Sequence, residues 1–339
     1  MYLFWPPSST YTPLMSRFRL PILIAAMVLM CACSGGDDLS DGADCGTAGK
    51  IKVGSKPWAV AADARTQRLY SADEFDNTVT VLDLCSYEQI AVLDSGTGPN
   101  SISIDRGTGT AFVANFNSND VTVIGDDAVV RTISVGQAPW SVLAGDGTDV
   151  AYVANSEGGS VMILSAEQPE PTATIDGLAG PRGLALSGQT LYVAEADANK
   201  VRVINLDTRE LAGEVAVGQR PQGMAIDPSR NELWVTSLDE ATVTVVDLET
   251  LTVLATIPVG LSPLQVAVEP SRHRAYTADS FGDSITVIDT VSHEVVNTYR
   301  GVQRPWDVEP AEDGSYIYVA NSATSELVVL SPEDLEPAD

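Results

Sequence analysis

The chain of 339 residues carries an aromatic residue, flanked by small and apolar residues, at a regular interval. These aromatic residues are separated by 40 or 42 positions and lie at Tyr70, Phe112, Tyr152, Tyr192, Trp234, Tyr276 and Tyr318. A fixed period of about 40–45 residues is typical of a repeat architecture, in which every copy forms the same unit. The interval therefore predicts seven repeats, with the aromatic segment as one strand in each.

Each repeat begins at a proline, and a glycine often stands three residues before it. The prolines are Pro57, Pro99, Pro139, Pro181, Pro221, Pro263 and Pro305. Glycine permits a positive φ and proline fixes φ, so these segments predict a reversing loop that enters a strand. The strand that follows carries a small residue at one position, which suits innermost strands crowded around an axis: Ala59, Ser101, Ser141, Gly183 and Gly223.

Two further strands complete the repeat. A β-branched strand with alternating pattern, as at 243–245, follows a polar loop, and a fourth strand, as at 253–257, ends most repeats. Alternation with a period of two indicates a strand. Four strands and tight turns in about 42 residues leave no room for a helix. We therefore expect an all-β, seven-bladed β-propeller with four-stranded blades.

The last repeat stops after its third strand, at 327–330, while residues 49–54 resemble the fourth strands of the other repeats. An open edge invites unwanted pairing, so folded proteins avoid it. We predict that the N-terminal strand completes the last blade and closes the ring. The propeller then spans 45–331, and residues 332–339 form an acidic tail.

The N-terminal segment has the pattern of an export signal. Arg17 and Arg19 precede an apolar run over 20–30, too short for a confident membrane span. We interpret 1–32 as a signal peptide whose true start is Met15. The run ends at Cys31 and Cys33, and the small Ala32 before Cys33 resembles the lipidation site of bacterial lipoproteins. Cys33 is therefore the predicted lipid anchor, followed by a flexible acidic tether over 33–44. An ordinary cleaved signal with incidental cysteines is the alternative.

Two cysteines, Cys45 and Cys85, remain after lipidation, and cysteines of exported proteins can pair. Cys45 precedes the strand that closes the last blade, and Cys85 lies in a turn of the neighbouring first blade. We predict a Cys45–Cys85 disulfide, provided that their Cα atoms come within about 7 Å.

Charge and motifs exclude several classes of protein. The net charge of −27 argues against nucleic acid, which needs clustered Lys and Arg. Neither His273 nor His293 has Cys, His or acidic partners at ligand spacing, so we expect no metal site. Neither Cys-x-x-Cys-His nor Gly-x-Ser-x-Gly occurs. We expect no cofactor and assign no catalytic residue. A ring of Asx residues after the aromatic strand is interpreted as turn-forming.

One constellation could bind a ligand. The loops around the prolines should all lie on one face, and they gather cations and tryptophans around the central mouth: Lys56, Trp58, Trp140, Arg182, Arg220, Arg304 and Trp306. Cations beside aromatic rings suit a small anionic or planar ligand. Neutralisation of these cations by nearby acids is the equally weighted alternative.

The segments Tyr-Val-Ala-Asn at 152–155 and 318–321, each followed by a Val-rich strand, resemble the YVTN-type β-propeller repeat family. The resemblance covers roughly 45–331. It implies the propeller fold but no single function, because the family and its neighbours include surface proteins, binding proteins, lactonases and oxidoreductases.

We interpret the chain as a monomeric, non-catalytic binding propeller of the bacterial cell envelope, anchored by lipid on the periplasmic or outer side. Its partner is an unknown envelope protein or a small anionic or planar ligand. Two alternatives stay open, namely a lactonase-like hydrolase that uses the central mouth and a purely structural envelope protein.

Overall fold

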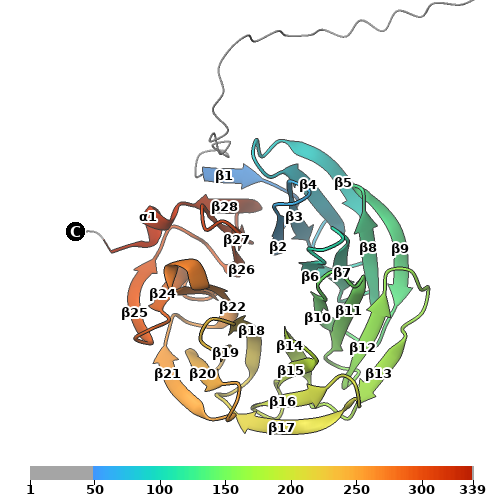
Figure 1. Cartoon of the computed structure of the whole chain (residues 1–339). Coiled ribbons are helices and arrows are strands. Elements are labelled where there is room, and N and C mark those ends of the chain that lie inside the picture. The colour runs from blue at the N-terminus through green and yellow to red at the C-terminus, as the bar shows by residue number, and fades with distance from the viewer. Residues whose placement is uncertain (1–48, 338–339) are drawn as a thin grey trace, which may run out of the picture. The chain divides into compact units, whose positions relative to one another are not determined.

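The computed structural model describes residues 49–337. Seven antiparallel four-stranded sheets are arranged in a ring around a central opening, as Figure 1 shows. Each sheet is one blade, and the blades follow the seven prolines in order, so the predicted seven-bladed propeller is confirmed. No helix between residues 49 and 337 combines the length and apolarity needed to span a bilayer.

In the first six blades the four strands follow one another in chain order from the axis to the rim, and in the seventh the outer strand is β1 (Gly49–Lys52). The innermost strands are β2 (Pro57–Asp63), β6 (Pro99–Ile104), β10 (Pro139–Ala144), β14 (Pro181–Ser187), β18 (Pro221–Asp227), β22 (Pro263–Glu269) and β26 (Pro305–Pro310). The second strands, which carry the repeated aromatic residue, are β3 (Arg68–Asp73), β7 (Ala111–Asn115), β11 (Val150–Asn155), β15 (Thr190–Glu195), β19 (Glu232–Ser237), β23 (Arg274–Asp279) and β27 (Ile317–Asn321).

The third strands are the β-branched ones. They are β4 (Thr78–Asp83), β8 (Asp120–Gly125), β12 (Ser160–Ser165), β16 (Lys200–Asn205), β20 (Thr242–Asp247), β24 (Ser284–Asp289) and β28 (Glu326–Leu330). The outer strands are β5 (Gln89–Asp94), β9 (Ala128–Ser134), β13 (Ala173–Asp176), β17 (Glu210–Ala216), β21 (Val253–Pro258), β25 (Glu294–Tyr299) and β1 (Gly49–Lys52). Alternation along the third strands places their residues in the packed space between blades.

The seventh blade has the order β1-β28-β27-β26, so its outer strand comes from the N-terminal end of the propeller. Gly49 pairs with Val329 and Lys52 with Glu326, in antiparallel register. This pairing covers the edge of β28 and confirms the predicted ring closure. The chain then continues past β28 into a short helix, α1 (Pro332–Leu335), whose Leu335 is buried against the sixth and seventh blades.

The hydrophobic core lies between neighbouring blades. Trp234, Tyr276, Phe112 and Tyr318 are the largest side chains with almost no exposed surface, and all four belong to second strands. A fully buried aromatic side chain stabilises a fold by about 1.5–3 kcal/mol relative to an exposed one. The repeated aromatic residue is therefore the anchor of each interface between blades.

The Asx side chains that follow the aromatic strands are fully buried. Asp73 accepts hydrogen bonds from the hydroxyls of Ser71 (2.7 Å) and Thr80 (2.6 Å), while Asn115 donates to the hydroxyl of Thr122 (2.9 Å). The turn-forming role expected from the sequence would pair them with backbone groups of tight loops. The partners are instead side-chain hydroxyls, mainly in the adjacent strand. Their role is still structural, because they join the second and third strands beneath the proline loops.

Candidate functional site

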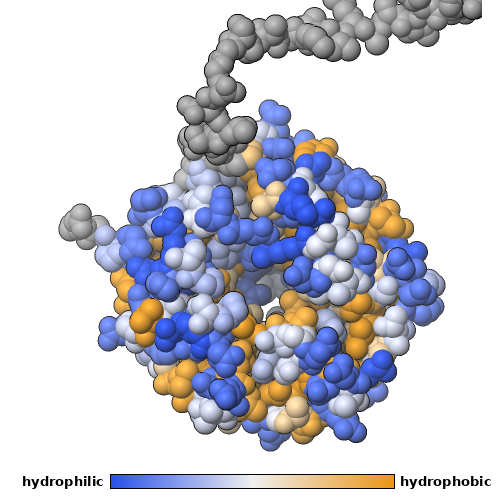
Figure 2. Space-filling model, in the orientation of Figure 1, coloured by the Kyte–Doolittle hydropathy of each residue, from blue (hydrophilic) through white to orange (hydrophobic). Residues whose placement is uncertain are grey.

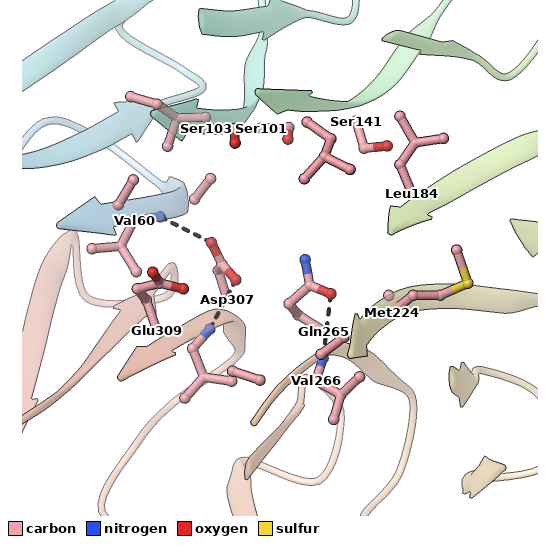
Figure 3. Close-up of a pocket in the computed structure, with 18 of the residues that line it drawn as sticks. Val60, Ser101, Ser103, Ser141, Leu184, Met224, Gln265, Val266, Asp307 and Glu309 are labelled. Carbon is pink, nitrogen blue, oxygen red and sulfur yellow. Dashed lines mark hydrogen bonds between the residues drawn. The ribbon is translucent and has the colours of Figure 1, made fainter. Parts of the chain in front are cut away.

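A cavity of about 830 Å³ lies on the propeller axis, lined by the innermost strands of the blades. Figure 2 shows one face of the molecule hollowed at its centre, with hydrophilic residues on one side of the opening and hydrophobic residues on the other. The close-up in Figure 3 separates these walls: Asp307 and Glu309 project from one, Ser101, Ser103 and Ser141 from another, and Leu184 and Met224 from a third. The cavity is of the size that takes small molecules.

Its polar wall arises from one position of the repeat, two residues after each proline. Five of the blades carry the predicted small residues there. Two of these, Gly183 and Gly223, have no room for a side chain. A Cβ on Gly183 would collide with Gln222, and a Cβ on Gly223 would collide with Leu264 and Gln265. The sixth and seventh blades depart from the pattern with Gln265 and Asp307. Sequence reasoning missed these two residues, although their departure from a small residue at a repeat position was a visible signal.

The side chain at this position contacts the innermost strand of the next blade, where the inner edge of that strand has unpaired backbone groups. Ser101 Oγ accepts from the Val142 N–H (3.2 Å), and Asp307 Oδ2 accepts from the Val60 N–H (3.0 Å). Asp307 Oδ1 also accepts from the Val308 N–H at 2.9 Å. The polar residues at the axis therefore satisfy the open edges that the ring geometry leaves.

Burial disfavours the charged form of the Asp307 carboxyl group. Removal from water raises the pKa of this carboxyl to about 6, although the hydrogen bonds from the Val60 and Val308 N–H groups oppose the rise. No Lys or Arg of the described chain forms an ion pair with it. Asp307 is thus an unneutralised carboxyl in the cavity wall that titrates close to physiological pH.

Glu309, two residues further along β26, has a cationic partner. Arg106, which follows β6 in the second blade, reaches Glu309 at 3.1 Å and Glu312 at 3.1 Å. Since Glu309 belongs to the seventh blade, the first blade lies between the partners, and the ion pair spans part of one mouth of the cavity. Desolvation raises the pKa of Glu309 to about 7, and Arg106 limits the rise.

The opposite mouth is surrounded by the predicted proline-loop residues. Trp58 and Trp306, from the first and seventh blades, stack with ring centroids 3.8 Å apart and an interplanar angle of 18°. Trp140 lines the cavity from the third blade, and the guanidinium of Arg182 lies 4.1 Å from the centre of its ring. The three tryptophans at this mouth, of which Trp58 and Trp306 form a stacked pair, are called the tryptophan rim (Trp58, Trp140 and Trp306).

The cations of this face are largely engaged. Lys56 forms an ion pair with Glu74 (2.6 Å), and Arg220 forms one with Asp239 (3.2 Å). Burial and the nearby Arg220 lower the pKa of Arg182. Their acidic partners, Glu74 and Asp239, lie in the loops after the second strands. Ligand binding by Lys56, Arg182, Arg220 and Arg304 stays a prediction.

Arg304 differs from the other cations, since its guanidinium lies 5.4 Å from the ring centre of the exposed Phe281. Its backbone N–H donates to the Asp283 carboxylate at 2.8 Å. Arg304 therefore lies on the outer part of the face, away from the stacked Trp58–Trp306 pair. It extends the aromatic and cationic character of this face to the sixth blade.

The two histidines lie in turns of the sixth blade, His273 between β22 and β23 and His293 between β24 and β25. His273 ends a 3₁₀ turn (Pro270–Arg272) in the left-handed conformation. His293 contacts Glu232 of the neighbouring blade at 3.1 Å, an acidic partner that the linear sequence did not reveal. In the part of the chain that the structure describes, no group of three or more His, Cys, Asp or Glu side chains could hold a metal ion.

Cys33 and Cys45 fall outside residues 49–337, as do the signal segment and the tether. The lipid anchor and the Cys45–Cys85 disulfide therefore stay predictions. Cys85 itself lies in the turn between β4 and β5, in the first blade, as the repeat pattern indicated.

Comparisons with known proteins agree with this architecture. A chain of hydrazine synthase from Kuenenia stuttgartiensis superposes with a TM-score of 0.74 over 87% of this chain and 99% of that one. The sequence identity is 16%. This likeness shows the fold alone. No family model and no curated protein matches the sequence, so membership of the YVTN-type family stays a prediction.

Proposed function

We propose that the protein is an exported, lipid-anchored propeller that binds a small planar ligand in its axial cavity without transforming it. The observation that carries the proposal is the cavity of about 830 Å³, entered past the tryptophan rim. Stacked or edge-on aromatic contacts favour flat ligands, by about 0.5–1.5 kcal/mol for each pair. Export and anchoring rest on the sequence of residues 15–33.

Small molecules that copurify with the natively expressed protein test this proposal. We expect mass spectrometry to detect a planar compound with the wild-type protein, and much less of it with a Trp58→Ala, Trp306→Ala double variant. Phe75→Ala is the matched control, because Phe75 is an exposed aromatic residue of the same face that does not line the cavity. Equal recovery from the double variant, or no enriched compound at all, would reject the cavity as the binding site.

A second candidate function is hydrolysis, for which Asp307 and Glu309 provide a specific argument. Two carboxyl groups with pKa values raised to about 6 and about 7 in one cavity are suited to general acid–base catalysis near neutral pH. A panel of lactones tests it. Turnover by the wild type that is lost in Glu309→Gln supports a hydrolase, and no turnover leaves binding as the function.

A further inference from the structure

The lining of the cavity carries more acidic than basic side chains. The ionisable side chains of its lining are Asp146, Glu269, Asp307, Glu309, Glu312 and Arg106. Arg106 is shared between Glu309 and Glu312, and Glu269 is paired with Arg272 (3.2 Å) outside the lining. Asp307 has no cation within reach in the described chain. The lining therefore lacks a cation opposite the Asp307 carboxylate.

The hydrogen bonds of Asp307 leave that group able to bind more. Each of its oxygens accepts one backbone N–H, and a carboxylate offers about four acceptor sites in total. The two backbone donors fix the carboxylate on the wall, and Figure 3 shows it projecting toward the space between Ser101 and Gln265. It is a fixed acceptor without a neutralising partner.

The tryptophan rim shows that its ring faces attract cations. Lys56 Nζ lies 4.9 Å from the ring centre of Trp58, and the Arg182 guanidinium lies 4.1 Å from that of Trp140. A cation over an indole face gains about 0.5–2 kcal/mol, more as water is excluded. Lys56 and Arg182 already occupy one face of Trp58 and of Trp140, so a ligand can use only the parts of these rings that they leave free.

We infer that the axial cavity selects an organic cation, whose ammonium or guanidinium group binds Asp307 while its planar body contacts the tryptophan rim. The inference rests on the proposed function and replaces the expectation of an anionic ligand. An anion is disfavoured because Lys56 and Arg220 are already paired with Glu74 and Asp239, whereas the interior carries Asp307. N–H donors of the ligand would use the acceptor sites of Asp307 that the Val60 and Val308 N–H groups leave free.

Three probes of one shape and different charge test the inference: benzylamine, benzyl alcohol and benzoate. Binding to the purified propeller is measured by saturation-transfer NMR and by calorimetry at pH 7.5. We expect benzylamine to bind at least about tenfold more tightly than benzyl alcohol, because a hydrogen bond to a charged group is worth about 1.5–3 kcal/mol. Benzoate is expected to bind most weakly.

Variants locate the charge that makes the difference. Asp307→Asn should remove the preference for benzylamine over benzyl alcohol, and Glu309→Gln should retain most of it. Asp176→Asn is the matched control, since Asp176 is an exposed carboxylate on an outer strand and lies outside the lining. Circular dichroism and the melting temperature verify that each variant is folded. Should Asp307→Asn not fold, loss of the preference for benzylamine as the pH falls through about 6, in the wild type and in Glu309→Gln alike, assigns the charge to Asp307 rather than to Glu309.

The outcomes separate the inference from the proposed function. Equal binding of benzylamine and benzyl alcohol would overturn the cation selectivity. If the Trp58→Ala, Trp306→Ala variant abolishes that binding, the cavity remains the binding site. Tighter binding of benzoate would also overturn it. Binding of none of the probes would reject the cavity together with its selectivity.

Discussion

Two buried carboxyl groups, Asp73 and Asp279, set the pH response of the fold at the residue scale. Both have 0% exposure and accept hydrogen bonds from neighbouring hydroxyls. Desolvation outweighs those bonds and raises the pKa of each to about 6, from 3.8. A folded-state pKa above the unfolded one means that the folded protein holds its proton more tightly. The associated stability is full below about pH 4 and is lost as the pH rises through 6.

We therefore expect the free energy of unfolding to be lower at pH 7.5 than at pH 5, by an amount on the order of a few kcal/mol. Asp307 and Glu309 act in the same direction, since their pKa values are also raised. Asp73→Asn should reduce the difference, because Asn already fills this position in the second, third and seventh blades. Urea unfolding at both pH values measures the effect, and a wild type that is more stable at pH 7.5 would contradict it.

The innermost strands show at the scale of single elements why the axis of the ring needs small side chains. A Cβ on Gly183 would collide with the backbone carbonyl of Gln222 in the next blade. Ser141 occupies the same position of the third blade and bonds to the Arg182 carbonyl instead. Close packing therefore differs from blade to blade. Gly183 and Gly223 leave no room for a side chain, whereas the second, third, sixth and seventh blades place a polar group at the same position.

Gly183→Ala should destabilise the propeller by about 1–3 kcal/mol, since the added methyl forces two backbones apart. Ser141→Ala at the equivalent position should cost about 1 kcal/mol, through the lost hydrogen bond alone. Thermal unfolding compares the two variants. A smaller loss for Gly183→Ala than for Ser141→Ala would show that the inner strands can separate more easily than the structure indicates.

The repeat explains which parts of the molecule the sequence could predict. The proline and the aromatic residue recur seven times and the small residue five times, so irregular copies do not hide the period, and blade count, strand order and ring closure follow. The site depends on residues that occur once. Asp307 and Gln265 break the repeat, while Glu74 and Asp239 pair with Lys56 and Arg220 across loops whose side-chain directions no period specifies. Contacts that occur only once can be identified only from the three-dimensional structure.

Closure of the ring by β1 can be tested by deletion of residues 45–54. Loss of β1 exposes the edge of β28, so we expect a lower melting temperature and a broader unfolding transition. Lys50→Ala is the control, because it changes only an exposed side chain with a weak 4.0 Å ion pair to Glu326 and keeps the strand. A truncated protein that melts like the full chain would show that β1 contributes nothing to closure.

At the scale of the whole molecule, the propeller is a ring with a cavity on its axis, and the predicted lipid anchor, Cys33, precedes β1 in the sequence. Cys33→Ser should move the protein from the membrane fraction to the soluble fraction of cells, because stable anchoring needs more than one acyl chain. Cys31→Ser is the matched control. Immunoblots of the two fractions measure the result, and an unchanged membrane fraction would argue against lipidation at Cys33.

The pairing of Gly49 with Val329 also fixes an order of events in time. A ribosome makes β1 before any other strand of the ring and β28 after all the others, so β1 waits without its partner during nearly the whole of synthesis. The entropic cost of joining such distant segments grows only slowly with chain length, but pairing over long separations is slow. A chain that is released early lacks β28 and leaves β1 unpaired. The ring can therefore close only after the last blade has been made.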